Sequence, residues 1–159
     1  MPQDDATTLL KVENLKTWFG HGARTVRAVD GISFEIRKGE TFAILGESGC
    51  GKSMTALSMM QLVPPGGRVV SGKVEFHGQD LLQYSEMQMR SVRGNRVAMI
   101  FQEPMTSLNP VLTIGEQIAE VVEQHVGLKG RLLQARVEEL LEQVGIPDPV
   151  QRQYDYPPR

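Results

Sequence analysis

The feature that most restricts the fold of this chain is the octapeptide GESGCGKS at residues 46–53. It matches the pattern G-x-x-x-x-G-K-[ST] of a phosphate-binding loop at every constrained position. Glycines let a backbone turn with positive φ and bring its N–H groups close to phosphate oxygens. A helix that follows such a loop directs its positive end at the same anion. The octapeptide therefore predicts a strand, a nucleotide-binding loop and a helix, in that order.

The residue types of this loop predict a role for each position. Lys52 should reach the β- and γ-phosphates, and Ser53 should place its hydroxyl on Mg²⁺. At Cys50, a variable position of the pattern, only the backbone is needed. The alternative is a glycine-rich turn with a stray lysine, but a chance match in a chain of this length has odds of about one per cent. The expected ATP-binding positions are Gly46, Glu47, Ser48, Gly49, Cys50, Gly51, Lys52, Ser53 and Met54.

The segments on either side of the loop have the expected patterns. Residues 42–45 (FAIL) form an apolar run without alternation, which is typical of a strand covered on both faces in a parallel sheet. Residues 52–62 have helical composition until the PPGG stretch ends them. Residues 97–101 (VAMIF) predict a second buried strand.

Two other regions predict the rest of the secondary structure. Residues 10–19 and 26–36 are strand-like, and apolar residues at every second position indicate an antiparallel sheet with one exposed face. Residues 81–93 predict a helix. Thr113 and Glu116 form a T-x-x-E capping box that starts another helix, and a further helix over 132–144 stops at Gly145.

Composition narrows the class of protein. The 159 residues suggest one domain, and a formal net charge of −2 implies no general attraction to nucleic acid. A single cysteine rules out an internal disulfide, and no run approaches the roughly 18 apolar residues of a membrane span. The polar start MPQDDATT is not a signal peptide, so the simplest reading is a cytoplasmic protein. The histidines give no metal signature, and Arg90, Arg93 and Arg96 are interpreted as a solvated basic face.

Together with the downstream stretch MIFQEPMTSLNP, the octapeptide resembles the ATP-binding subunits of ABC transporters. More narrowly, it resembles the group that imports dipeptides, oligopeptides, nickel and glutathione. Within this group it resembles the glutathione importers most. The resemblance implies an α/β P-loop NTPase fold of the ABC type. For this chain the resemblance implies an antiparallel β-subdomain, an incomplete parallel core and the start of a helical subdomain. Residues 1–8 are then a flexible tail, residues 9–103 the ATP-binding core, and residues 104–159 the start of the helical subdomain.

The resemblance also implies roles for residues outside the loop. Gln102 has the position of the Q-loop glutamine, which joins the Mg²⁺ shell or holds the attacking water, so Lys52 and Gln102 are the expected catalytic residues. Phe19, just before Gly20, has the position of the aromatic residue that stacks on adenine, with Trp18 as the alternative. Both aromatic residues could instead belong to the core or to the sheet surface.

The implied cofactors are ATP and Mg²⁺, and the implied partners are other transporter components. They are transmembrane permease subunits, a second ATP-binding domain and, indirectly, a periplasmic or extracellular solute-binding protein; no nucleic acid is expected. The expected location is the cytoplasmic face of the inner or plasma membrane. There, ATP binding and hydrolysis would power import of peptides or related small solutes.

Three motifs of the family are absent from the sequence. It has no LSGG-type signature, no apolar run that ends in Asp-Glu, and no histidine in the switch position. In the family, the aspartate organises Mg²⁺ and the glutamate polarises the attacking water. The chain is therefore interpreted as the N-terminal part of a transport ATPase that does not turn over ATP by itself. The alternative is a non-catalytic remnant that at most binds nucleotide; a P-loop kinase or GTPase would not be expected to carry FQEPMTSLNP.

Overall fold

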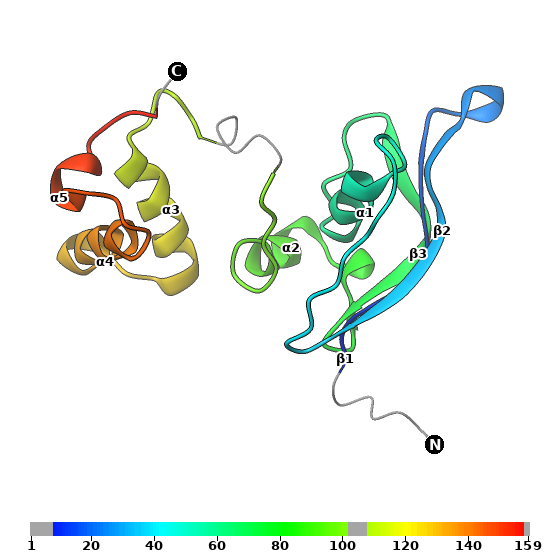
Figure 1. The fold of residues 1–159 in the computed structure, drawn as a ribbon, viewed down its shortest axis with the longest axis horizontal. Helices are drawn as coiled ribbons and strands as arrows, with labels where there is room; N and C mark the ends of the chain where they lie inside the picture. Colours follow the sequence, from blue (N-terminus) through cyan, green and yellow to red (C-terminus); the bar gives the residue numbers. More distant parts are fainter. Residues whose placement is uncertain (1–7, 102–107, 158–159) are drawn as a thin grey trace. The chain divides into compact units, whose positions relative to one another are not determined.

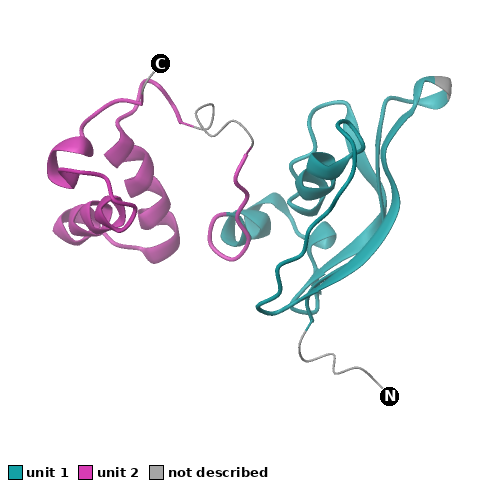
Figure 2. Ribbon diagram, in the orientation of Figure 1, with its two compact units in different colours: residues 1–93 teal, residues 94–159 magenta. Residues whose placement is uncertain are grey.

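The computed structural model describes residues 8–101 and 108–157 (Figure 1). It divides the chain into two compact units, Met1–Arg93 and Gly94–Arg159 (Figure 2). The subdomain boundary expected near residue 103 falls outside the described residues. Thr8, the last residue of the expected tail, is the first residue of a strand.

Unit 1 is built on a four-stranded antiparallel sheet with the strand order β2-β1-β3-β4. One face of the sheet carries the buried apolar residues of the strands, which are Val12, Leu15, Val29, Val74 and Phe76. The opposite face carries ion pairs such as Lys11 with Glu35 and Lys73 with Glu75. This arrangement confirms the predicted antiparallel sheet with one exposed face. The strands are β1 (Thr8–Phe19), β2 (Val26–Arg37), β3 (Gly67–Phe76) and β4 (Gln79–Asp80), and the 3-10 turn η2 (Gly22–Arg24) joins β1 to β2.

Helix α1 (Lys52–Met59) follows the glycine-rich loop and packs on β1. A hydrogen bond of 2.6 Å joins the hydroxyls of Thr17 on β1 and Ser58 on α1, and both residues are fully buried. The helix is shorter than the predicted span of 52–62. It ends because Gln61 adopts a left-handed backbone with φ of 52°, which a helix cannot continue through.

The single helix predicted over residues 81–93 is instead two elements, η3 (Leu81–Gln83) and α2 (Glu86–Val92). Tyr84 and Ser85 between them have extended backbone. Ser85 caps α2 by accepting a hydrogen bond from the backbone N–H of Gln88. Ser85 therefore starts a new helix at a point where composition alone predicted continuity.

Both predicted buried strands are wrong for the described residues. Residues 42–45 form no strand, and residues 98–101 form none either. Leu45 is 90% exposed and Ile100 is 92% exposed. A strand covered on both faces needs neighbouring strands and helices, and no described strand pairs with either segment. The α/β class and the antiparallel sheet are confirmed, whereas a parallel core is not formed within the described part of the chain.

Unit 2 is helical, with α3 (Ile114–Val126), α4 (Gly130–Gln143) and α5 (Pro149–Arg152). The predicted capping box is confirmed, because Thr113 Oγ1 accepts from the Glu116 N–H and the Glu116 carboxylate accepts from the Thr113 N–H. These bonds to the backbone N–H and hydroxyl of Thr113 lower the pKa of Glu116. Gly145 has φ of 76° just after α4, as expected of a helix stop.

The chain after α5 completes the start of α3. The N–H groups of Ile114 and Gly115 donate to the carbonyls of Asp155 and Gln153 at 2.9 and 2.8 Å. These donors would otherwise have no partner inside the helix. None of the helices in residues 8–101 and 108–157 has the length and apolar character needed to cross a membrane.

The buried hydroxyl pair gives a test of how α1 is attached to the sheet. Replacing Thr17 with Val should lower the free energy of unfolding by about 1–2 kcal/mol, because Ser58 loses a buried partner. Ser58→Ala should cost a similar amount, and the double variant should cost less than the sum of the two. Urea denaturation of the three variants measures this, and strictly additive losses would contradict a direct interaction.

Candidate functional site

The glycine-rich loop is exposed and leads directly into α1. Residues 46–50 are all exposed, and the Cys50 N–H donates to the Glu47 carbonyl at 3.3 Å to form a turn. Gly49 and Gly51 have φ of 81° and 93°. These are the positive values that the sequence pattern predicted, and they are strained for residues with a side chain.

Gly51 fixes the end of the loop against β2. It is the N-cap of α1, and a Cβ atom at this position would lie 2.2 Å from the backbone oxygen of Ala28. No side chain fits at such a distance from a backbone atom. The close approach therefore requires glycine both for its φ and for its lack of a Cβ.

Lys52 bends back over the loop. Its Nζ donates to the carbonyls of Gly46 and Glu47 at 2.8 and 2.7 Å, and it lies 3.5 Å from the Sγ of Cys50. The ammonium group is thus held at the loop backbone by groups that are themselves exposed. A positive charge is therefore concentrated where the loop and the helix N-terminus meet.

The first turn of α1 offers free hydrogen-bond donors. Among the described residues, the backbone N–H groups of Lys52, Ser53 and Met54 have no acceptor, whereas the Thr55 N–H donates to the Gly51 carbonyl at 2.8 Å. Unpaired N–H groups at a helix start carry partial positive charge and favour anions. Together with the Lys52 ammonium, this set of donors fits a phosphate group.

The described residues provide fewer ligands for a metal ion than donors for a phosphate group. The Ser53 hydroxyl is exposed at the first turn of α1 and has no partner within the described chain. The described part also contains no cluster of three or more His, Cys, Asp or Glu side chains that could hold a metal. Gln102, the second expected Mg²⁺ contact, lies outside the described residues.

The two candidate aromatic residues have different surroundings. The Phe19 ring lies beside Gly67, where a Cβ would be 2.5 Å from it, and the same space borders Val63 just after α1. The Trp18 ring instead faces Arg27 on β2, whose guanidinium carbon is 5.0 Å from the ring centroid. The indole N–H of Trp18 is buried without a hydrogen-bond partner among the described residues.

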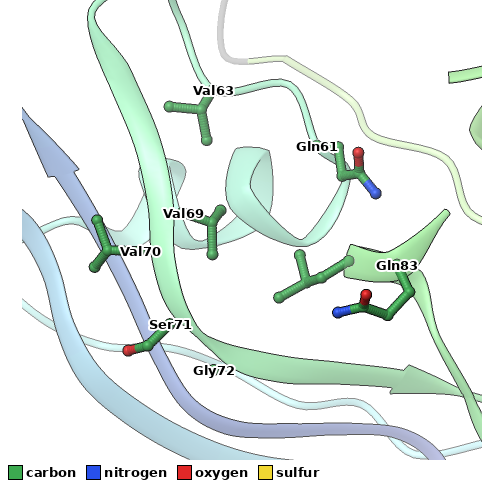
Figure 3. Close-up of a pocket in the computed structure, with 8 residues that line it drawn as sticks. Gln61, Val63, Val69, Val70, Ser71, Gly72 and Gln83 are labelled. Carbon is green, nitrogen blue, oxygen red and sulfur yellow. The ribbon is translucent and has the colours of Figure 1, made fainter. Parts of the chain in front are cut away.

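A separate cavity of about 410 Å³ lies between the end of α1 and β3 (Figure 3). Its walls come from Gln61 and Val63 after α1, from β3 and from η3. No side chain in its lining ionises near neutral pH, so it offers no acid–base chemistry. The groups suited to phosphate chemistry therefore lie at the loop and not in this cavity.

Sequence reasoning missed the role of Arg93, which was interpreted as part of a solvated face. Its side chain is only 16% exposed and donates to the backbone carbonyls of Met60 and Gln61 and to the Glu86 carboxylate. The same bond lowers the pKa of Glu86. Arg90, in contrast, fits the interpretation as a solvated basic residue, because 71% of its side chain is exposed. The sequence carried no signal for this difference, because two of the acceptors are backbone atoms.

Comparison with known proteins decides the family. A sequence model described as "ABC transporter" matches residues 29–158, which is most of the chain. The chain belongs to the ABC transporter family. This match confirms the resemblance that the loop and the stretch MIFQEPMTSLNP predicted.

Similar proteins narrow the group. The oligopeptide transport ATP-binding protein AppD of Bacillus subtilis (strain 168) is 50% identical over 154 residues, which are 96% of this chain and 47% of that protein. The dipeptide transport ATP-binding protein DppD of Escherichia coli (strain K12) is 48% identical over 149 residues, 94% of this chain and 46% of that protein. The chain thus spans about half the length of the curated relatives it matches. The resemblance to the peptide-importer group is confirmed, and the closer likeness to glutathione importers stays a prediction.

A solved structure agrees on the fold. The dimeric ATP-binding cassette MJ0796, in a post-hydrolysis state with ADP and Pi, aligns with a TM-score of 0.74 and 20% identity. The alignment covers 93% of this chain and 61% of that cassette. At this identity the likeness concerns the fold alone, and it confirms the predicted fold class.

Two loop glycines allow a matched test of the close approach to β2. Gly51→Ala should lower the free energy of unfolding by roughly 3 kcal/mol, because strain at positive φ adds to a clash with Ala28. Gly49→Ala should cost about 1 kcal/mol, because its φ is similar but no atom lies within 4 Å of the added Cβ. Urea denaturation followed by circular dichroism compares them, and equal losses would count against the Ala28 contact.

Proposed function

We propose that this chain is the nucleotide-binding part of an ABC importer subunit that uses ATP to move peptides or related small solutes. The observation that carries the proposal is the set of phosphate-compatible donors at residues 46–54, in a chain that belongs to this family. The names of the similar AppD and DppD proteins support peptides as the solute class. Because the chain spans about half the length of these relatives, transport is proposed for the whole protein and nucleotide binding for this chain.

Each loop group has a defined task in this proposal. The N–H groups of the first turn of α1 and the Lys52 ammonium bind the phosphates of ATP, and this requires Lys52 to release the carbonyls it now contacts. The Ser53 hydroxyl binds Mg²⁺, with Gln102 as a second contact and the expected partner in orienting water. When bound, Mg²⁺ neutralises charge on the phosphate oxygens.

For the adenine base we propose Phe19 and not Trp18. The Phe19 ring borders Val63, just after α1, and so lies on the same side of β1 as the phosphate-binding helix. The Trp18 ring already has the Arg27 guanidinium over it. An aromatic face that stacks on a base contributes about 1–3 kcal/mol in related settings.

We expect the 159-residue chain to bind ATP without sustained turnover. Its sequence has no LSGG-type stretch and no apolar run that ends in Asp-Glu, the groups that the resemblance assigns to the opposing nucleotide contact and to water activation. The whole protein would be a transport ATPase. It would work with permease subunits and a second ATP-binding domain at the cytoplasmic face of the membrane, and indirectly with a solute-binding protein.

Calorimetry with MgATP tests the phosphate site. Lys52→Ala should weaken binding about 30-fold or more, because a charge-assisted contact to phosphate is lost. Lys38→Ala, which removes the same charge from an exposed turn before the loop, is the matched control and should leave affinity unchanged. Absence of binding by the parent chain, or equal binding by both variants, would contradict the proposed function.

The base contact is tested by comparing MgATP with magnesium tripolyphosphate. Phe19→Leu should weaken MgATP binding about tenfold and leave tripolyphosphate binding unchanged, because only the base is stacked. Trp18→Leu should leave both affinities close to those of the parent chain. The reverse pattern would assign the adenine contact to Trp18.

A further inference from the structure

The phosphate-binding helix α1 is attached to the rest of unit 1 at three points. At its start, Gly51 touches the backbone of Ala28 on β2, and near its end the buried hydroxyl of Ser58 bonds to Thr17 on β1. Both of these contacts are to the sheet. The third attachment comes from a different element, α2 and the residue that follows it.

The third attachment is made by Arg93. Its Nε donates to the Met60 carbonyl at 2.8 Å, and its Nη2 donates to the Gln61 carbonyl at 3.1 Å. Its Nη1 donates to both carboxylate oxygens of Glu86 at 2.9 and 3.0 Å, which orients the guanidinium. The carbonyls at a helix end carry partial negative charge, so a guanidinium there is favourable.

Gln61 strengthens the same attachment from the other side. Its Nε2 donates to the carbonyls of Leu81 and Tyr84 at 2.5 and 3.1 Å, and its backbone keeps φ of 52°. A non-glycine residue at this φ persists only where its surroundings hold it. The cavity of about 410 Å³ also borders Gln61, so close packing does not support this side of the helix end (Figure 3).

From these contacts we propose that Arg93 is a positioning residue for ATP, which acts through α1 on the N–H groups that receive the phosphates. This inference rests on the proposed nucleotide binding at residues 46–54. An eight-residue helix is about 12 Å long and behaves as one rigid piece. A change at its carbonyl end therefore tilts its amide end relative to Gly51 and the loop.

A purely structural role for Arg93 makes a different prediction. If the side chain only stabilised unit 1, its loss would lower the melting temperature and leave the affinity of the folded protein unchanged. Met60 is only 6% exposed, so we expect the end of α1 to keep its apolar anchor when Arg93 is replaced. Affinity measured on folded protein thus separates positioning from stability.

Arg90 provides a matched control for this test. Arg90 lies on α2, one turn before Arg93, carries the same charge and pairs with the same Glu86 at 3.5 Å. Within the described part of the chain it forms no hydrogen bond or ion pair with α1. The test compares Arg93→Met, Arg90→Met and Arg93→Lys in the full 159-residue chain. MgATP affinity is measured by calorimetry at a temperature where circular dichroism shows each variant to be folded.

Arg93→Met should weaken MgATP binding about fivefold, Arg90→Met should leave it within about 1.5-fold, and Arg93→Lys should restore most of the loss. The lysine retains a cation that reaches the helix-end carbonyls. Equal affinities for the parent chain and Arg93→Met would overturn the inference while leaving the proposed function intact. Absence of MgATP binding by the parent chain would instead overturn the proposed function.

Amide hydrogen exchange without nucleotide tests the inference independently of binding. Arg93→Met should speed exchange along α1 as far as Thr55, the first N–H bonded within the helix, whereas Arg90→Met should not. Faster exchange confined to the residues around Met60 would mean local fraying. That result would overturn the positioning role even if the parent chain failed to bind ATP.

Discussion

The approach of Gly51 to the carbonyl oxygen of Ala28 is the constraint on which the site depends. A Cβ at Gly51 would lie 2.2 Å from that oxygen, so the loop end can approach β2 this closely only without a side chain. This contact sets where α1 begins, and hence where its free N–H groups and the Lys52 side chain lie. The phosphate-compatible geometry is therefore supported from the antiparallel sheet, and residues 42–45 before the loop contribute no strand pairing to it.

The sequence predicted those features whose causes are local. Alternating apolar residues form one-sided strands, and the T-x-x-E box at Thr113 starts α3, because both signals act within a few residues. The loop glycines likewise have the positive φ that their pattern requires. The wrong predictions concerned residues 42–45 and 97–101, where burial depends on neighbouring strands that the run itself does not specify.

The attachment at the end of α1 shows a second limit of sequence reasoning. Arg90 and Arg93 look alike in the sequence, yet Arg93 alone of the two reaches carbonyls more than 30 residues earlier in the chain. Backbone acceptors have no residue-type signature, so no pattern of side chains identifies them. Gln61 has a left-handed backbone that its residue type does not predict, since glycine and asparagine are the usual residues in that conformation.

Binding and turnover also differ in how locally they are encoded. The proposed donors for phosphate come from residues 46–54 and are held by contacts within unit 1, through Gly51, Ser58 and Arg93. Of the groups expected to activate water, Gln102 lies outside the described residues and the Asp-Glu pair is absent from the sequence. Affinity for nucleotide can therefore respond to a side chain such as Arg93 that contacts neither nucleotide nor water. For this reason we argue that ATP binding, and not hydrolysis, is the property of this chain to measure.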